Sequence, residues 1–577
     1  MDNNDIIEEC DDMNNDKKII KRGRKRDSAR DYYVIKDNKL MCIVEKCNIT
    51  FSSNTSISVL KRHIKKYHNI ILVNKDEQYN NKDDNIDEDN LDEEGVYNLF
   101  SIAFAKKSLP YSLIEDERFK SALIAYNKVP NLMMTAYKLK EKTLINGDKI
   151  CKDIINNLSK SKIPTTIVID GWTNTRSNKV TNILLMSNGY ANFYSSIENY
   201  TSKNDTEWLV SQLEIKINDL IKDKIIIVAI TTDNENLMKA TCQKLKEKFP
   251  VLIDMPCCSH LLQLCLKSIC SVKGIDNIIR EVLNIIHTID NTKSNVIKLE
   301  NFQKVDGISI PLKIIIPTMI RWGSIITSID RLLCLRKYIE LILPDIDKSI
   351  WDKINELFLY IKPFKNYIDK SQKNNVSICS VSKNIEELIN NLNNAKLPLY
   401  LSKNKKNIID TIKNKWNKHI NTTIINVALF FDFDEKIIIN NDMITFIENW
   451  GSIYLTTYEL IKEKDINIIK GIINLQIREF ISKHSQFINL FTIINTIKNT
   501  CVIKKIDYNS IFVWSGFTTT HFELSTIAIG ILSICPSEAA VERSFSMQSD
   551  IHSLDRNKLS SELIEAELRI KFNMNSL

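Results

Sequence analysis

The sequence has no apolar run long enough to cross a lipid bilayer. Its longest ones, such as Ile225–Ile230 and Ile314–Ile316, fall far short of the roughly 20 residues that a membrane helix needs. The acidic, polar stretch Met1–Asp16 has no apolar segment of the kind that forms the core of a secretion signal. The sequence therefore excludes a membrane-spanning class and predicts a protein that stays inside the cell.

A dominant charge and regularly spaced cysteines are also lacking. The net charge of the 577 residues is only +7, so overall charge says little about partners. Thirteen cysteines at uneven spacing in a long chain favour reduced thiols and a metal site over a disulfide framework. With 44% hydrophobic residues, the chain can bury a large core, and its length favours several domains.

Charge is concentrated in two blocks near the N-terminus. Residues 17–30 carry eight Lys or Arg and one acid, a block that resembles a nuclear-import signal and also suits DNA phosphates. Residues 75–95 carry ten Asp or Glu and almost no apolar residues, so they cannot bury a core. We therefore predict a basic disordered tail over 1–30 and an acidic disordered linker over 73–95.

A metal-binding pattern lies between these blocks, in a module predicted to span residues 31–72. Cys42, Cys47, His63 and His68 form C-x4-C-x15-H-x4-H, which matches the ligand types and approximate spacing of a structural zinc site. The cysteines are expected on a hairpin around Met41–Cys47, and the histidines on one side of a helix, Ser56–Tyr67. Four protein ligands leave no open position, so Zn²⁺ would stabilise a module that is too small to fold alone.

Basic side chains beside the histidines suggest what this module binds. Lys61, Arg62 and Lys65 suit contacts to DNA phosphates or to the major groove. The alternative is a set of scattered core thiols beside a solvated basic face. With Tyr32, Tyr33 and Phe51 around the site, the module resembles a BED-type zinc finger.

The middle of the chain changes from helical to strand periodicity and back. Residues 96–160 have helical apolar spacing, with breaks at Pro110 and Pro130, and predict a helical subdomain. The segments that follow are predicted as strands at Ile163–Asp170, Lys179–Met186 and Tyr190–Ser196, a helix at Asp205–Ile221, a strand at Lys224–Thr231, a helix at Glu235–Lys248, a strand at Leu252–Met255 and a helix at Ser259–Ile269. This is the element order of a ribonuclease-H-like sheet, and we assign its first part to residues 161–270.

Two acids stand at the ends of the predicted strands. Asp170 ends the first strand, where Gly171 is expected to force a turn, and Asp233 ends the fourth. Those strands are neighbours in a ribonuclease-H-like sheet, so both carboxylates would meet at one edge. Paired carboxylates can hold two divalent cations that activate a water and stabilise the leaving oxygen of a phosphodiester. The alternative is that each Asp is a helix cap or a turn former.

A C-terminal phrase resembles a known family. Cys535–Ser546 reads CPSEAAVERSFS and follows Trp514 and an apolar helix, Leu524–Leu532. This closely resembles the C-terminal dimerisation signature of hAT family transposases. Further matches in family order are Leu109–Glu115, Asp170–Thr173, Asp233–Ala240, Cys257 with His260, Ile320–Trp322 and Asp555–Leu559, so the resemblance covers residues 31–577.

The resemblance implies a third catalytic acid and an interrupted fold. Glu542 matches the family's Glu, which a closing helix delivers to Asp170 and Asp233, where the three acids bind Mg²⁺ or Mn²⁺. The implied fold is a multidomain α/β protein whose ribonuclease-H-like mixed sheet is interrupted by a large all-helical insertion, 271–505. A C-terminal dimerisation region, 506–577, completes the sheet domain.

The resemblance also assigns roles to four other residues. Trp322 would stack against an unpaired base at the cut DNA end, and Arg321 would bind a phosphate. Cys257 and His260 would support the active site. The alternatives are a buried helix tryptophan, an arginine paired in the core, and plain packing. Glu235, Ile320 and Gly323 depart from the family's usual residues, and Glu235 adds a charge beside Asp233.

Two functions follow from these residues. The first is a nuclear, homo-oligomeric transposase that cleaves and transfers double-stranded DNA with an Asp/Asp/Glu triad, which the presence of all three acids favours. The second is a domesticated relative, a zinc-finger DNA-binding dimer that regulates transcription or chromatin without catalysis. The apolar positions expected to form the C-terminal interface serve either a partner or the domain's own core; they are Leu524, Ile527, Ala528, Ile531 and Leu532.

Overall fold

The computed structural model describes most of the chain from residue 93 onward. The described residues are 33–36, 39–42, 47, 49–52, 55, 59–60, 63, 93–125, 135–174, 176–199, 205–233, 235–318, 322–395, 404–420, 422–483, 487, 490–504, 508–553, 556 and 558–574. The predicted tail 1–30 and linker 73–95 lie outside them, apart from 93–95, which begin a helix. The chain forms two compact units, 1–90 and 91–577. None of the described helices is long and apolar enough to span a membrane.

The first unit contains a three-stranded antiparallel sheet. Its strands are β1 (Tyr33–Lys36), β2 (Lys39–Cys42) and β3 (Thr50–Ser52), in the order β1-β2-β3. The predicted hairpin corresponds to β2 and β3, whereas β1 was not predicted. Leu60 and His63 are helical and buried, in line with the helix predicted for this segment.

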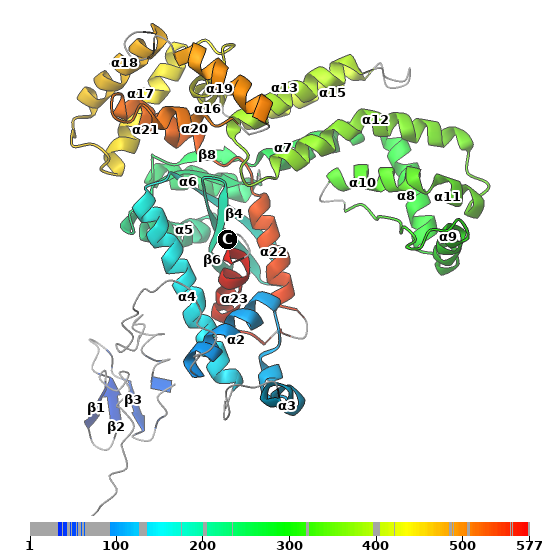
Figure 1. Ribbon diagram of the computed structural model, residues 1–577, viewed down its shortest axis with the longest axis horizontal. Helices are drawn as coiled ribbons and strands as arrows, with labels where there is room; N and C mark the ends of the chain where they lie inside the picture. The colour runs from blue at the N-terminus through cyan, green and yellow to red at the C-terminus, as the bar shows by residue number, and fades with distance from the viewer. Residues whose placement is uncertain are drawn as a thin grey trace, which may run out of the picture. The chain divides into compact units, whose positions relative to one another are not determined.

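The second unit is built on a mixed five-stranded sheet (Figure 1). Its strands are β4 (Thr165–Thr173), β5 (Lys179–Ser187), β6 (Tyr190–Asn199), β7 (Ile227–Thr232) and β8 (Ile253–Pro256). The order is β6-β5-β4-β7-β8, in which β4, β5 and β6 are antiparallel while β7 and β8 run parallel to β4. This is the predicted ribonuclease-H-like topology.

One local prediction was wrong, because β4 does not end at Asp170. The strand continues through Gly171, which pairs with Thr181, and ends at Thr173. The reason is the partner strand: β5 offers an unbroken antiparallel ladder to Lys179, so β4 stays paired on that side after its pairing with β7 stops at Val168. A glycine weakens a strand but does not end it when the ladder continues.

The sheet is covered on both faces because its strands alternate between two hydrophobic clusters. Ile167 and Ile169 join the larger cluster, which includes residues of α5 (Thr206–Lys222), α6 (Asn236–Lys248) and α7 (Cys258–Cys270). Val168 points to the other face and joins a smaller cluster with α22 (Ala539–Ile551) and α23 (Ser561–Asn573). The C-terminal helices therefore complete the sheet domain.

Four helical segments precede the sheet, where a helical subdomain was predicted. They are α2 (Glu93–Lys107), the 3-10 helix η2 (Tyr111–Glu115), α3 (Glu117–Ala125) and α4 (Ala136–Ser161). Helix α4 packs closely on α23: a Cβ atom on Gly147 would lie 2.7 Å from the Cα atom of Ala566. This contact attaches the subdomain to the C-terminal end of the chain.

All described elements between α7 and α22 are helical; they cover the insertion predicted as helical over 271–505 and, with α20 and α21, the start of the C-terminal region predicted from 506. They are α8 (Ile275–Asp290), α9 (Lys293–Val305), α10 (Gly323–Cys334), α11 (Arg336–Ile342), α12 (Lys348–Ser371), α13 (Ile378–Asn394), α15 (Lys405–His419), α16 (Thr422–Phe431), α17 (Asn441–Thr457), α18 (Ile466–Ile481), α19 (Leu490–Lys504), α20 (Ser510–Ser515) and α21 (Phe522–Leu532). In Figure 1, α9, α10 and α11 gather at the far end of α12, while α16–α21 gather beyond β8.

The insertion is attached to the sheet by specific polar contacts. Tyr458 donates its hydroxyl hydrogen to the carbonyl of Ile227 at 2.7 Å, at the start of β7. Trp450 Nε1 donates to the carbonyl of Val251 at 2.8 Å, just before β8.

The apolar side of α21 is buried. The five positions that were expected to serve either a partner or the domain's own core all lie in the core of the second unit; they are Leu524, Ile527, Ala528, Ile531 and Leu532.

Candidate functional site

The strand register brings Asp170 and Asp233 together. Val168 of β4 pairs with Thr231 of β7, and each Asp lies two residues beyond that pair in parallel strands. Asp170 also accepts a hydrogen bond from the Gly171 amide at 2.7 Å. Asp233 accepts one from the Glu235 amide at 3.2 Å, so it forms the turn into α6 as well. The turn-forming role considered for Asp233 thus coexists with its place at the sheet edge.

Helix α22 brings Glu542 to the same place. Asp170 and Trp172 share the face of β4 that carries Val168, and α22 covers that face. The ring of Trp172 stacks on Phe545 of α22, with centroids 5.7 Å apart and planes inclined by 25°. Because Phe545 lies one helical turn after Glu542, this stack holds the Glu542 side of α22 over the sheet edge.

The segment before α22 is fixed to both the sheet and α7. The hydroxyl of Thr231 donates to the carbonyl of Cys535 at 2.6 Å, and the Cys535 amide donates to the hydroxyl of Thr166 at 3.0 Å. The Cys258 amide, at the start of α7, donates to the carbonyl of Pro536 at 2.9 Å. These bonds set the position from which α22 begins, and with it the position of Glu542.

One pocket of about 280 Å³ collects the acids. Its charged and polar lining consists of the three predicted catalytic residues and seven others, among them Glu538 and Gln263, which were not singled out from the sequence; the ten are Asp170, Lys179, Thr181, Asn199, Asp233, Glu235, His260, Gln263, Glu538 and Glu542. Three strands, the turn after β7 and four helices, including α22 from the far end of the sequence, thus line one polar hollow.

Burial and mutual repulsion raise the pKa of the acids in this pocket. Burial, reinforced by the charge of Asp233, raises the pKa of Asp170 to about 7. Burial raises the pKa of Asp233 to about 6, against the hydrogen bond from the Glu235 amide. The pKa of Glu538 lies well above its ordinary value, first through burial and then through Asp170 and Asp233. The clustered carboxylates therefore form a site that a cation would stabilise.

The chemistry of these donors suits Mg²⁺ or Mn²⁺. Both cations prefer hard oxygen ligands, and the pocket offers carboxylates and the side-chain amides of Gln263 and Asn199. A bound cation reverses the effect of the clustered charges on the carboxyl pKa values. Among the described His, Cys, Asp and Glu residues, one group of three has its ligand atoms all within 4.8 Å of one another, and it lies in the first unit. No three of the acids that line this pocket, all of them described residues, lie that close together.

Cys257 and His260, to which the resemblance assigns a supporting role, lie beside the acids. Cys257 is fully buried at the start of α7, and its sulfur lies 3.5 Å from the Glu538 amide, which donates to it. His260 lines the acidic pocket, and burial lowers the pKa of its imidazole while Glu235 and Glu542 partly oppose that effect. Cys257 thus contacts the segment that carries the acids, and His260 faces them.

Trp322 does not line the acidic pocket. Trp322 lies at the start of α10, half-buried against the larger hydrophobic cluster, and is not among the described residues that line the pocket. Arg321 lies outside the described residues. The base-stacking and phosphate-binding roles therefore stay predictions from the resemblance.

The first unit brings three of the four predicted metal ligands together. The ligand atoms of Cys42, Cys47 and His63 all lie within 4.8 Å of one another, and Cys47 Sγ is 3.4 Å from His63 Nε2. The rings of Phe51 and His63 pack edge to face, with centroids 5.1 Å apart. Cys42 and His63 are buried and Cys47 is half-buried, and the three residues form a group that can hold a metal ion. The fourth ligand, His68, and the basic residues Lys61, Arg62 and Lys65 lie outside the described residues.

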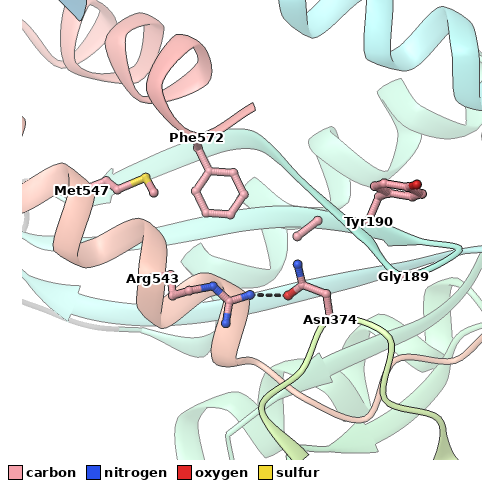
Figure 2. A pocket seen from close by; sticks show the side chains of 7 residues that line it. Gly189, Tyr190, Asn374, Arg543, Met547 and Phe572 are labelled. Atoms are coloured by element: carbon pink, nitrogen blue, oxygen red, sulfur yellow. Dashed lines mark hydrogen bonds between the residues drawn. The ribbon is translucent and has the colours of Figure 1, made fainter. Parts of the chain in front are cut away.

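Arg543, next to Glu542, points into a second hollow of about 370 Å³ (Figure 2). There its guanidinium donates to the side chain of Asn374 and to the carbonyl of Gln372, the latter at 3.4 Å. Both acceptors belong to the loop between α12 and α13. Helix α22 therefore presents an acid to one hollow and ties the insertion to the sheet through the next residue.

Part of this arrangement matches a described family. Residues 134–285 match Domain of unknown function (DUF659). The matched segment begins just before α4 and ends within α8, so it contains Asp170, Asp233, Cys257 and His260 but neither Glu542 nor the N-terminal cysteines. The match is consistent with a transposase-derived ribonuclease-H-like region. A search of curated proteins finds no match to the chain.

Proposed function

We propose that this protein is a hAT-type DNA transposase that cleaves and transfers DNA strands with Asp170, Asp233 and Glu542. The observation that carries the proposal is the convergence of these three acids on one pocket. The first two come from neighbouring strands, and the third comes from a helix on the other side of the insertion. A structural role for each acid would not require them to meet.

The acidic side chains of the pocket have different roles in this proposal. Asp170 and Asp233 would hold divalent cations where the pairing of β4 with β7 ends, and Glu542 would close the site from α22. When bound, Mg²⁺ or Mn²⁺ would supply activation of a water or terminal hydroxyl and stabilisation of the leaving oxygen of the phosphodiester. The Trp172–Phe545 stack and the bonds to Cys535 keep α22 in register with the sheet, so that Glu542 stays opposite the two Asp residues.

The N-terminal unit supplies DNA binding in this proposal. Zn²⁺ held by Cys42, Cys47, His63 and His68 stabilises the module, and Lys61, Arg62 and Lys65 contact double-stranded DNA. The protein works in the nucleus as a homo-oligomer through its C-terminal region. Because the apolar residues of α21 are buried within the second unit, the proposed interface uses other surfaces of the C-terminal region.

The test is cleavage of a labelled duplex that carries the terminal repeat expected beside the gene, together with nicking of supercoiled plasmid DNA. The wild-type protein is compared with Asp233→Asn and with Asp254→Asn, a matched change on β8 outside the pocket. We expect metal-dependent cleavage by the wild type and by Asp254→Asn, and at least about a hundredfold less by Asp233→Asn.

DNA binding without cleavage would contradict the proposal. Tight, zinc-dependent binding of the duplex without cleavage by any of the three proteins, in either Mg²⁺ or Mn²⁺, would overturn the enzyme proposal. It would assign the chain to the second function, a transposase-derived DNA-binding regulator.

A further inference from the structure

The acidic pocket contains buried polar atoms that lack a hydrogen-bond partner. Oε2 of Glu538, Oε1 of Gln263 and Nε1 of Trp172 are buried and unpaired, and all three residues line this pocket. Polar atoms in protein interiors are normally paired, because leaving one unpaired costs about 1–3 kcal/mol. Three such atoms around one hollow indicate that the pocket is shaped for a ligand.

Glu538 is the least expected of these residues. Its side chain is only 2% exposed, whereas the side chains of Asp170 and Asp233 are half-buried. Its backbone amide donates a hydrogen bond to Cys257 Sγ at 3.5 Å, whereas Oε2 of its carboxyl group has no partner. Burying a carboxylate without a compensating charge is costly, so an acid at this position requires a cationic partner or a bound proton.

We propose that Glu538 is a fourth carboxylate ligand of the divalent-cation site. The proposal rests on the function above, in which Asp170, Asp233 and Glu542 hold Mg²⁺ or Mn²⁺. Glu538 precedes Glu542 by one helical turn, so both acids face the same hollow. Mg²⁺ and Mn²⁺ take about six oxygen ligands each, and carboxylates share these positions with water and substrate oxygens, so the shell has room for a fourth carboxylate. The unpaired amide oxygen of Gln263 offers a further neutral donor from α7.

A purely structural role makes a different prediction. If Glu538 only fills space as a neutral acid, an isosteric amide will replace it without consequence for cation binding. Glu538→Gln keeps the volume and one acceptor oxygen but removes the charge that a cation needs. This substitution therefore separates the two roles.

The experiment measures Mn²⁺ binding by the full-length, zinc-loaded protein, using calorimetry and the Mn²⁺ electron paramagnetic resonance signal. Four proteins are compared: wild type, Glu538→Gln, Glu538→Asp and the matched control Asp550→Asn. Asp550 lies on the same helix, and its side chain is largely exposed beside Lys571. We expect about a tenfold or greater loss of Mn²⁺ affinity in Glu538→Gln, wild-type affinity in Asp550→Asn, and an intermediate value in Glu538→Asp.

Melting temperatures show whether a loss of Mn²⁺ affinity comes from misfolding of the variant. Without divalent cations, Glu538→Gln should melt at or above the wild-type temperature, because a buried amide costs less than a buried carboxylate. Saturating Mn²⁺ should raise the melting temperature of the wild type more than that of Glu538→Gln. Equal Mn²⁺ affinity and equal metal-induced stabilisation in the wild type, Glu538→Gln and Glu538→Asp would overturn the proposal.

The outcome is distinguishable from failure of the proposed function. Mn²⁺ binding that depends on Glu538, in a protein that does not cleave DNA, would support the ligand role and refute the transposase activity. DNA cleavage by Glu538→Gln, with wild-type Mn²⁺ affinity and an unchanged Mn²⁺ activation curve, would support the activity and refute the ligand role.

Discussion

The side-chain amide of Asn182 donates a hydrogen bond to Oε1 of Gln548 at 2.9 Å, although the two residues are 366 positions apart. Asn182 lies on β5 opposite Asp170, and it also donates to the hydroxyl of Ser544 at 2.9 Å. Its own oxygen accepts a hydrogen bond from Ser196 at 2.8 Å. One fully buried amide therefore ties α22, the helix that carries Glu542, to the strand beside Asp170.

Asn182→Ala should lower both stability and activity. The substitution leaves the buried oxygen of Gln548 and the hydroxyl of Ser196 without their partner, at about 1–3 kcal/mol each. We expect the free energy of unfolding to fall by about 3 kcal/mol in urea denaturation, and DNA cleavage to fall at temperatures where the variant is still folded. Asn192→Ala, on neighbouring β6, is the control. If both variants behaved alike, the tie between β5 and α22 would have no special role.

The raised carboxyl pKa values predict how stability depends on pH without divalent cations. Burial and the Asp233 charge raise the pKa of Asp170 to about 7, so the folded state binds more protons than the unfolded state between about pH 4 and 7. Its stabilising effect is complete below pH 4 and is lost as the pH rises through 7. Asp170→Asn avoids this loss, so it should be more stable than the wild type at pH 8, by on the order of 1 kcal/mol or more.

The measurement is urea denaturation of both proteins in chelator at several pH values. The advantage of Asp170→Asn should shrink toward pH 4, while Asp219→Asn, an exposed change on α5, should track the wild type throughout. Saturating Mn²⁺ should reverse the order at pH 8, because the cation stabilises only the wild-type carboxylate. A difference between wild type and Asp170→Asn that did not vary with pH would contradict the pKa assignment.

Removing zinc should unfold the first unit and leave the second unchanged. Structural Zn²⁺ contributes roughly 10 kcal/mol or more to such a module, and the two units are separate compact bodies. Cys47→Ser should lose the bound zinc and the affinity for duplex DNA, whereas the melting transition of residues 91–577 should stay at the wild-type temperature. Cys334→Ser, which replaces an exposed cysteine, should keep both properties. Zinc content measured by atomic absorption and DNA binding measured by fluorescence anisotropy test this.

Most of the sheet could be predicted because its strands combine β-branched residues with short polar breaks. The β5–β6 connection is an example: Asn188 and Gly189 have positive φ values of 47° and 79°, which suits the tight hairpin turn that Asn-Gly favours. Gly171 was misread because a glycine after an Asp is a turn signal locally. Its strand persists through pairing with a partner that local sequence does not reveal.

Site residues close together in the sequence could be predicted from the sequence pattern, whereas distant ones could not. Asp170 and Asp233 follow from the strand order, whereas Glu542 lies beyond the insertion and was found through the family resemblance. Asn182 and Glu538 were missed, although each carries a signal. Asn182 is polar within the apolar run of β5, and Glu538 is an acid among small residues, and such positions are buried only when a partner compensates them.

A last prediction concerns the ion pair that closes the C-terminal end of the fold. The guanidinium of Arg556 donates to both carboxylate oxygens of Glu567, at 3.0 and 2.7 Å, and it lies over the Tyr111 ring, 5.6 Å from the centroid. Glu567 is fully buried and Arg556 nearly so. The pair therefore joins the segment before α23 to α23 itself and to the helical subdomain.

Glu567→Gln should destabilise the second unit by about 3–5 kcal/mol, because it leaves the Arg556 charge buried without its counter-ion. Replacing both partners, as in Arg556→Met with Glu567→Leu, should cost less than Glu567→Gln alone, since no charge remains buried. Asp550→Asn, which breaks the exposed pair with Lys571, should cost less than about 1 kcal/mol. Urea denaturation of the four proteins tests this order. A double variant less stable than Glu567→Gln would show that the apolar pair packs badly here, and that the ion pair is required for the fit between α23 and the subdomain.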